Sequence, residues 1–95
     1  MKVYIAGKMA GDAGYKEKFR AAEHTLRARG HTPMHSAELP GGFEDEEYLH
    51  ICCAMIDVCD MVYLLPDWEG SVGARKERKY ARKRHKPVRI LEEEI

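Results

Sequence analysis

A long hydrophobic run is missing from this sequence, and cysteines are few. No segment reaches the roughly 18 apolar residues of a membrane-spanning helix, and the first apolar run is too short for a signal peptide. The three cysteines, Cys52, Cys53 and Cys59, are odd in number and lack the spacing of a disulfide framework or a zinc site. We therefore expect reduced thiols in a cytoplasmic protein that does not span a membrane.

A net charge is also missing, because 16 basic residues balance 16 acidic ones. An overall attraction to nucleic acid or to a membrane surface is therefore not indicated. The five histidines show no metal-ligand spacing, so we predict no metal site, and we predict no cofactor. A composition of 44% hydrophobic and 34% charged residues excludes a disordered chain, and the length fits one domain over residues 1–95.

Strand and helix patterns alternate along the chain. Short runs of β-branched and apolar residues predict strands at 3–6, 31–35, 60–65 and 88–91. Apolar residues at helical spacing predict helices at 15–30, 46–58 and 71–84. Pro33 suits an edge strand, since proline cannot donate to a sheet ladder. This order predicts an α/β fold, a three-layer α/β/α sandwich around a parallel four-stranded sheet with strand order 2-1-3-4.

Ligands of such sheets bind beyond the carboxyl ends of the strands, where the strand order reverses. In this chain that point lies between the first and third strands. The loops that meet there are Gly7–Gly14 and Pro66–Gly70. The sequence therefore predicts a ligand site between these two loops.

The start of the third helix is the sharpest local signal. Ser71 is a favourable N-cap, and Gly70 and Gly73 allow a ligand to approach the backbone. Free N–H groups at a helix start attract phosphate, although many structural helices begin in the same way. Glu77 is the only acid between Gly70 and Leu91, and no base stands three or four residues from it on the helix.

Two interpretations of Glu77 follow. Its side chain leans toward Gly73 and Ala74, which predicts a carboxylate pointing along a hollow toward the helix start. The alternative is a buried glutamate bonded to another element or to a partner subunit.

Nearly the whole chain resembles the nucleoside 2-deoxyribosyltransferase-like superfamily, in particular its short DUF4406-type proteins. The resemblance rests on Val3-Tyr4-Ile5-Ala6-Gly7, Ala37-Glu38-Leu39-Pro40 and Pro66-Asp67-Trp68-Glu69-Gly70-Ser71-x-Gly73-Ala74-x-x-Glu77. This superfamily also includes deoxynucleoside 5′-monophosphate N-glycosidases. The resemblance implies a Rossmann-like sheet and a nucleoside or nucleotide substrate.

The resemblance also implies roles for particular residues. Glu77 matches a glutamate nucleophile that attacks C1′ of the sugar, so that the base leaves and water or a second base completes hydrolysis or transfer. Ser71 matches a sugar- or phosphate-contacting position, and Gly7, with Lys8 and Met9, belongs to a first loop that closes over the nucleoside. Two positions depart from the pattern, because Lys8 replaces a common proline and Cys52 replaces an acid early in the second helix.

Three further residues have two interpretations each. Asp67 ends the third strand and is a candidate supporting acid, or else a loop-capping aspartate. Tyr4 and Trp68 are candidates for stacking on a base, although aromatic residues more often serve packing.

Two other functions remain open. The departure at Cys52 favours a catalytically silent nucleotide-binding module on the same fold. Nine of the 16 bases lie between Arg75 and Arg89, which is compatible with nucleic-acid binding. The segment has no base-reading motif, however, so a solvated face or pairing with Glu44–Glu47 of a neighbouring subunit is the more common explanation and we do not expect a nucleic-acid partner.

The apolar stretch Ile51–Ile56 predicts a homodimer through the second helix.

Overall fold

The structure, a computed structural model, describes residues 1–92. Its four strands form one parallel sheet in the order β2-β1-β3-β4, as predicted. The strands are β1 (Lys2–Ala6), β2 (Thr32–Met34), β3 (Met61–Leu64) and β4 (Val88–Ile90). The helices are α1 (Tyr15–Ala28), α2 (Asp45–Val58) and α3 (Val72–Lys83). Within residues 1–92, no helix is both long enough and apolar enough to cross a membrane.

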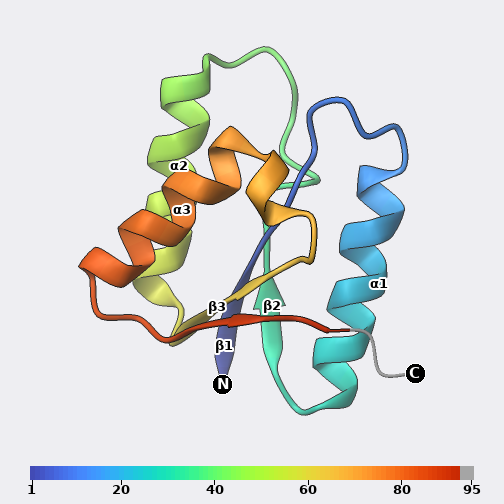
Figure 1. The fold of residues 1–95 in the computed structure, drawn as a ribbon, viewed down its shortest axis with the longest axis vertical. Coiled ribbons are helices and arrows are strands. Elements are labelled where there is room, and N and C mark those ends of the chain that lie inside the picture. Colours follow the sequence, from blue (N-terminus) through green and yellow to red (C-terminus); the bar gives the residue numbers. More distant parts are fainter. Residues whose placement is uncertain (93–95) are drawn as a thin grey trace.

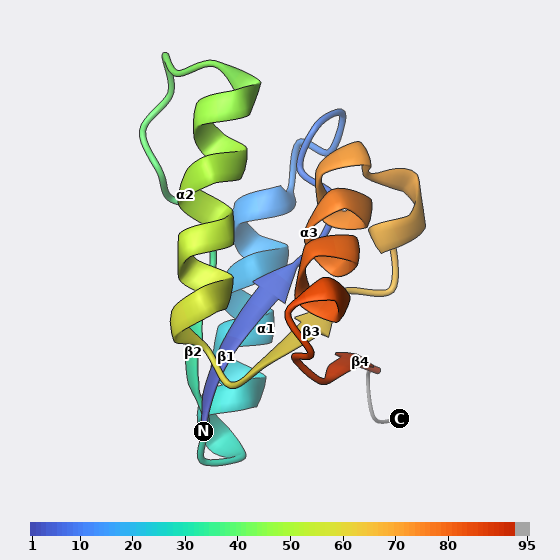
Figure 2. The ribbon, with the colours of Figure 1, turned by 90° about the vertical axis from the view of Figure 1, so that its left-hand side faces the viewer.

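The sheet is covered on both faces, which confirms the α/β/α sandwich. In Figure 1, α1 lies to the right of the strands and α2 and α3 lie to the left. Figure 2 looks onto the side of α2 and α3, with α1 behind the strands. Successive residues of a strand point to opposite faces, and β1 supplies both cores in this way. Val3 and Ile5 pack with Phe19 of α1, whereas Tyr4 and Ala6 pack with the residues of α2 and α3.

The ends of the elements follow local chemistry. Pro33 pairs with Val3 on the edge strand β2, where its missing N–H costs no sheet hydrogen bond. Gly30 follows α1 with φ 86°, and the N–H of His31 donates to the Leu26 carbonyl across the turn. The loop predicted at 66–70 is more ordered than expected, because Trp68–Gly70 forms a 3₁₀ turn, η1.

Gly7 is required where β1 leaves the sheet. A β-carbon at this buried position would lie 2.6 Å from Leu65 Cδ1, far inside van der Waals contact. The N–H of Leu65 also donates to the Ala6 carbonyl at 2.8 Å. The loops that follow β1 and β3 therefore leave the sheet side by side, at the carboxyl edge of the strands.

Candidate active site

Glu77 of α3 and Tyr4 of β1 form a buried hydrogen-bonded pair. The Tyr4 hydroxyl donates to Glu77 Oε2 at 2.9 Å. The Glu77 residue is 7% exposed and Tyr4 is fully buried. The small residues Ala74 and Ala81, on the same side of α3, let the helix approach the sheet closely enough for this contact. The carboxylate is thus enclosed and bonded to another element, which is the second of the two interpretations of Glu77, and it does not point along an open hollow.

Burial controls the protonation of this cluster. Burial raises the pKa of the Glu77 carboxyl, and hydrogen bonds from Cys52 and Tyr4 oppose that rise by favouring the charged form. Burial, followed by the charge of Glu77, raises the pKa of the Cys52 thiol to about 11. The same two causes hold the pKa of Tyr4 well above its ordinary value. Near neutral pH, Tyr4 and Cys52 therefore keep their protons and act as donors.

A second polar cluster joins the two loops at the sheet edge. The Lys18 ammonium, in the first turns of α1, donates to Asp12 Oδ2 and to Asp67 Oδ2, each at 2.5 Å, and to the Lys8 carbonyl at 2.7 Å. The backbone N–H of Lys8 donates to Asp67 Oδ1 at 3.1 Å. Partial burial lowers the pKa of Lys18, but the hydrogen bonds and charges of Asp12 and Asp67 outweigh it and raise the pKa. Asp67 therefore holds the first loop against the loop that follows β3.

The start of α3 completes this edge. The Ser71 hydroxyl accepts a hydrogen bond from the Ala74 N–H at 3.0 Å, which confirms Ser71 as the N-cap. A β-carbon on Gly70 would lie 3.8 Å from Lys8 Cδ, so the Lys8 side chain runs beside the helix start. Gly73 has open space except for the Ser71 hydroxyl, 3.9 Å from where its β-carbon would lie. Met9 packs partly buried against the α1 side of the core.

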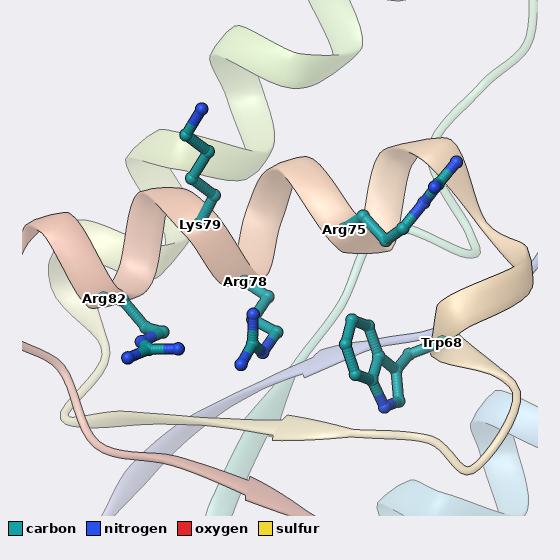
Figure 3. Close-up of a pocket in the computed structure, with 5 residues that line it drawn as sticks. All are labelled: Trp68, Arg75, Arg78, Lys79 and Arg82. Atoms are coloured by element: carbon teal, nitrogen blue, oxygen red, sulfur yellow. The ribbon is translucent and has the colours of Figure 1, made fainter.

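Trp68 lies elsewhere. It lines a cavity of about 410 Å³ on the side of α3 that faces β4, together with basic residues of the helix, as shown in Figure 3. The Arg78 guanidinium lies over its indole ring, 5.0 Å from the ring centre. The structure thus separates the two aromatic candidates, because Tyr4 is in the core beside Glu77 and Trp68 lies in this outer cavity.

The sequence analysis missed two features of the site. The first is the hydrogen bond from Tyr4 to Glu77, which joins residues 73 positions apart. The alternation of side chains along β1 could have placed Tyr4 on the sheet face that α2 and α3 cover, but not beside Glu77. Lys18 had no signal in the sequence, because it is one of four basic residues on α1 and nothing distinguishes it from the other three. Within residues 1–92, no group of three or more His, Cys, Asp or Glu side chains is placed to hold a metal ion.

The family model for the domain of unknown function DUF4406 matches residues 1–90. The chain belongs to this family. No curated protein of similar sequence was found.

Two solved structures share the fold of this DUF4406 protein. A 2-deoxyribosyltransferase from Leishmania mexicana superposes with a TM-score of 0.73 at 17% identity, covering 95% of this chain and 63% of that one. A CMP N-glycosidase from Clostridium botulinum superposes with a TM-score of 0.64 at 18% identity, covering 96% and 71%. The chain therefore spans less than two thirds of the Leishmania enzyme. At these identities the likeness concerns the fold.

Proposed function

We propose that this DUF4406 protein cleaves or exchanges the N-glycosidic bond of a nucleoside or a nucleoside 5′-monophosphate, with Glu77 as the nucleophile. The main support is the buried Glu77 carboxylate, which Tyr4 and Cys52 orient by hydrogen bonds. Within residues 1–92, no basic side chain forms an ion pair with it. A carboxylate without a cationic partner keeps its electron density available for attack. The activities named for the two solved structures that share the fold support the choice of substrate class.

The proposed reaction has two steps. In the first, a Glu77 oxygen bonds to C1′, the C1′–N bond breaks with its electron pair moving to the base, and the base takes up a proton. In the second, water or another base attacks C1′, the bond between C1′ and the Glu77 oxygen breaks with its electron pair returning to the carboxylate, and the attacking group loses a proton to solvent. The Tyr4 hydroxyl holds Oε2 at 2.9 Å, which fixes the orientation of the carboxylate through both steps.

The loops supply the proposed substrate contacts. Gly7, Lys8 and Met9 would cover the nucleoside, while the helix start at Gly70, Ser71 and Gly73 would receive a sugar hydroxyl or the 5′-phosphate. The position of the Lys8 side chain beside Gly70 supports a contact between its ammonium and that phosphate. Asp67 would support the reaction by holding the first loop in place through Lys18 and the Lys8 amide. Trp68 would contact only a part of the substrate that reaches the cavity beside α3.

The test is chromatography of free base after incubation with deoxynucleosides and their 5′-monophosphates. We expect release by the unchanged protein and none by Glu77→Gln, whose shape is nearly the same. Glu69→Gln is the matched control, because Glu69 is an exposed acid of η1, and it should release base at the unchanged rate. Equal release by Glu77→Gln would contradict the nucleophile assignment.

A catalytically silent nucleotide-binding module is the second candidate. It is favoured by Cys52, whose thiol has a pKa of about 11 and therefore cannot replace the charge of the acid expected at this position. This function predicts that a nucleotide raises the melting temperature, by mass action on the folded state, while no base is released.

We also propose a homodimer through α2 in the cytoplasm. The outer side of α2 exposes apolar surface, and Val58 is 55% exposed at its end. Met55 and Ile51, about one and two turns before Val58 on the same stripe, are only partly covered. Sedimentation across micromolar dilutions tests the dimer, and Ile51→Asp should shift the protein toward monomer.

A further inference from the structure

The side of α3 that faces β4 carries a second concave surface, which we call the α3 groove. It consists of two cavities of about 410 and 360 Å³ that share Trp68, Arg78 and Arg82 and therefore adjoin each other. The first extends along α3 to Arg75. The second extends over β4, where Arg89 joins the lining. Figure 3 shows Arg78 and Arg82 reaching from α3 on the same side as Trp68.

The positive charge of this groove is not neutralised within the described chain. Among residues 1–92, no acidic side chain forms an ion pair with Arg78, Arg82 or Arg89. Arg84 follows Arg82 by two residues but lines neither cavity, and unlike the groove arginines it pairs with an acid, Asp57, at 3.1 Å. Arginines gathered around a cavity without acids repel one another, and a bound anion would relieve that repulsion.

The groove also has an aromatic and apolar lining. Arg78 lies over the Trp68 ring at 5.0 Å, and Val88 and Ile90 of β4 line the second cavity, with Ile90 50% exposed. Solvated helix faces that only keep a protein soluble need no such lining. Aromatic rings and guanidinium planes beside cations are the elements on which single-stranded nucleic acids stack their bases.

The α3 groove is separate from the Glu77 site. Glu77 and Arg78 are adjacent in the sequence, but Glu77 points toward β1 and Arg78 toward Trp68. Neither cavity of the groove is lined by Glu77. The two sites therefore lie on different sides of α3, and each can be removed by substitution without touching the other.

We propose that the α3 groove binds single-stranded nucleic acid. Arg78, Arg82 and Arg89 contact phosphates of the strand, and one base stacks at the Trp68–Arg78 pair. Arg75 and Arg82 are seven residues apart on the helix, which corresponds to about 10 Å at about 1.5 Å per residue. Along a base-stacked strand, whose axial rise is about 3.4 Å per nucleotide, this length corresponds to about three nucleotides. The groove thus has room for a short stretch of strand.

The probe is a 5′-fluorescein-labelled 20-nucleotide oligothymidylate, followed by fluorescence anisotropy at several salt concentrations. Each phosphate neutralised on a single strand contributes about −0.7 to the slope of log K against log salt. Arg78, Arg82 and Arg89 together predict a slope of about −2.1, and Arg78→Ala/Arg82→Ala should reduce it to about −0.7. Trp68 is the only tryptophan, so quenching of its fluorescence by unlabelled strand reports stacking in the groove directly.

The matched control removes two arginines from the other face of the sheet. Arg20→Ala/Arg27→Ala lies on α1 and changes the net charge by the same amount. It should keep the slope of about −2.1 and the Trp68 quenching. Equal loss of affinity in both double variants would overturn the proposal, because the binding would then follow overall charge. The Glu77→Gln variant should bind the strand as the unchanged protein does, so a failure of the proposed enzymatic function would not affect this test.

Two competitors distinguish other occupants. A polyglutamate peptide of the same charge represents an acidic protein, and a 20-base-pair duplex represents double-stranded DNA. Weaker binding of both, without Trp68 quenching, would support the proposal. Equal or tighter binding of either would overturn the assignment to single strands.

Discussion

The bond between Tyr4 and Glu77 allows a quantitative prediction for Tyr4→Phe. The substitution keeps the ring in the core and deletes the hydroxyl that donates to Glu77 Oε2 at 2.9 Å. A hydrogen bond to a charged group contributes about 1.5–3 kcal/mol, and here the carboxylate is left buried with Cys52 as its remaining side-chain donor. We therefore expect Tyr4→Phe to lower the free energy of unfolding by about 1.5–3 kcal/mol at pH 8.

The pH dependence has a definite sign. Burial raises the pKa of Glu77 above its unfolded value, so the folded state binds the proton more tightly. The stability linked to this proton is fully present below the unfolded pKa, and it is lost as pH rises through the folded pKa. Tyr4→Phe raises the folded pKa further, because the lost hydrogen bond favoured the carboxylate. The difference between the two proteins should therefore be largest at alkaline pH and should shrink toward about 0.5–1.5 kcal/mol in acid, where the bond joins neutral groups.

Urea unfolding at several pH values measures this difference. Tyr80→Phe is the matched control, because the Tyr80 hydroxyl also donates to a carboxylate, Asp57 at 2.9 Å, but at an exposed position. Its effect on stability should be clearly smaller than that of Tyr4→Phe. The reasoning would be refuted if Tyr4→Phe lowered the free energy of unfolding at pH 8 by no more than Tyr80→Phe does. It would also be refuted if the loss caused by Tyr4→Phe became larger as the pH is lowered.

Three further predictions concern the loops and the thiols. Gly7→Ala should destabilise the protein by about 1–3 kcal/mol in urea unfolding, because its β-carbon would overlap Leu65, whereas Gly41→Ala, with open space, should not. Lys18→Met should accelerate hydrogen exchange of the Lys8 amide, since the loops lose their shared donor, while Lys16→Met should leave that exchange unchanged. Cys52, buried and with a pKa of about 11, should react with iodoacetamide at pH 8 far more slowly than in urea, as followed by mass spectrometry.

Local patterns were sufficient to predict the fold. The alternation of short apolar runs with amphipathic segments predicted the parallel sheet and its order, because right-handed crossovers leave few ways to bury those faces. Pro33 on an edge strand and Ser71 at a helix start were predictable for the same kind of reason, since each depends on hydrogen bonds of its own immediate backbone. Glu77 was identified by its isolation among bases, which is also visible in the sequence alone.

The surroundings of these residues depend on packing between distant segments, and only the tertiary structure decided them. Whether Glu77 would point along an open hollow or lie against β1 depended on how closely α3 packs on the sheet, and the approach at Ala74 and Ala81 encloses it beside Tyr4. Lys18 joins two loops because α1 starts beside the carboxyl edge of β3, a position that no local pattern encodes. Trp68 follows Asp67 directly, yet the 3₁₀ turn η1 carries its ring to the outer side of α3, away from the loop cluster that Asp67 joins. Residues adjacent in the sequence can lie in different sites because a turn of a few residues changes the direction of their side chains. The packing of the rest of the chain then determines which groups each side chain contacts.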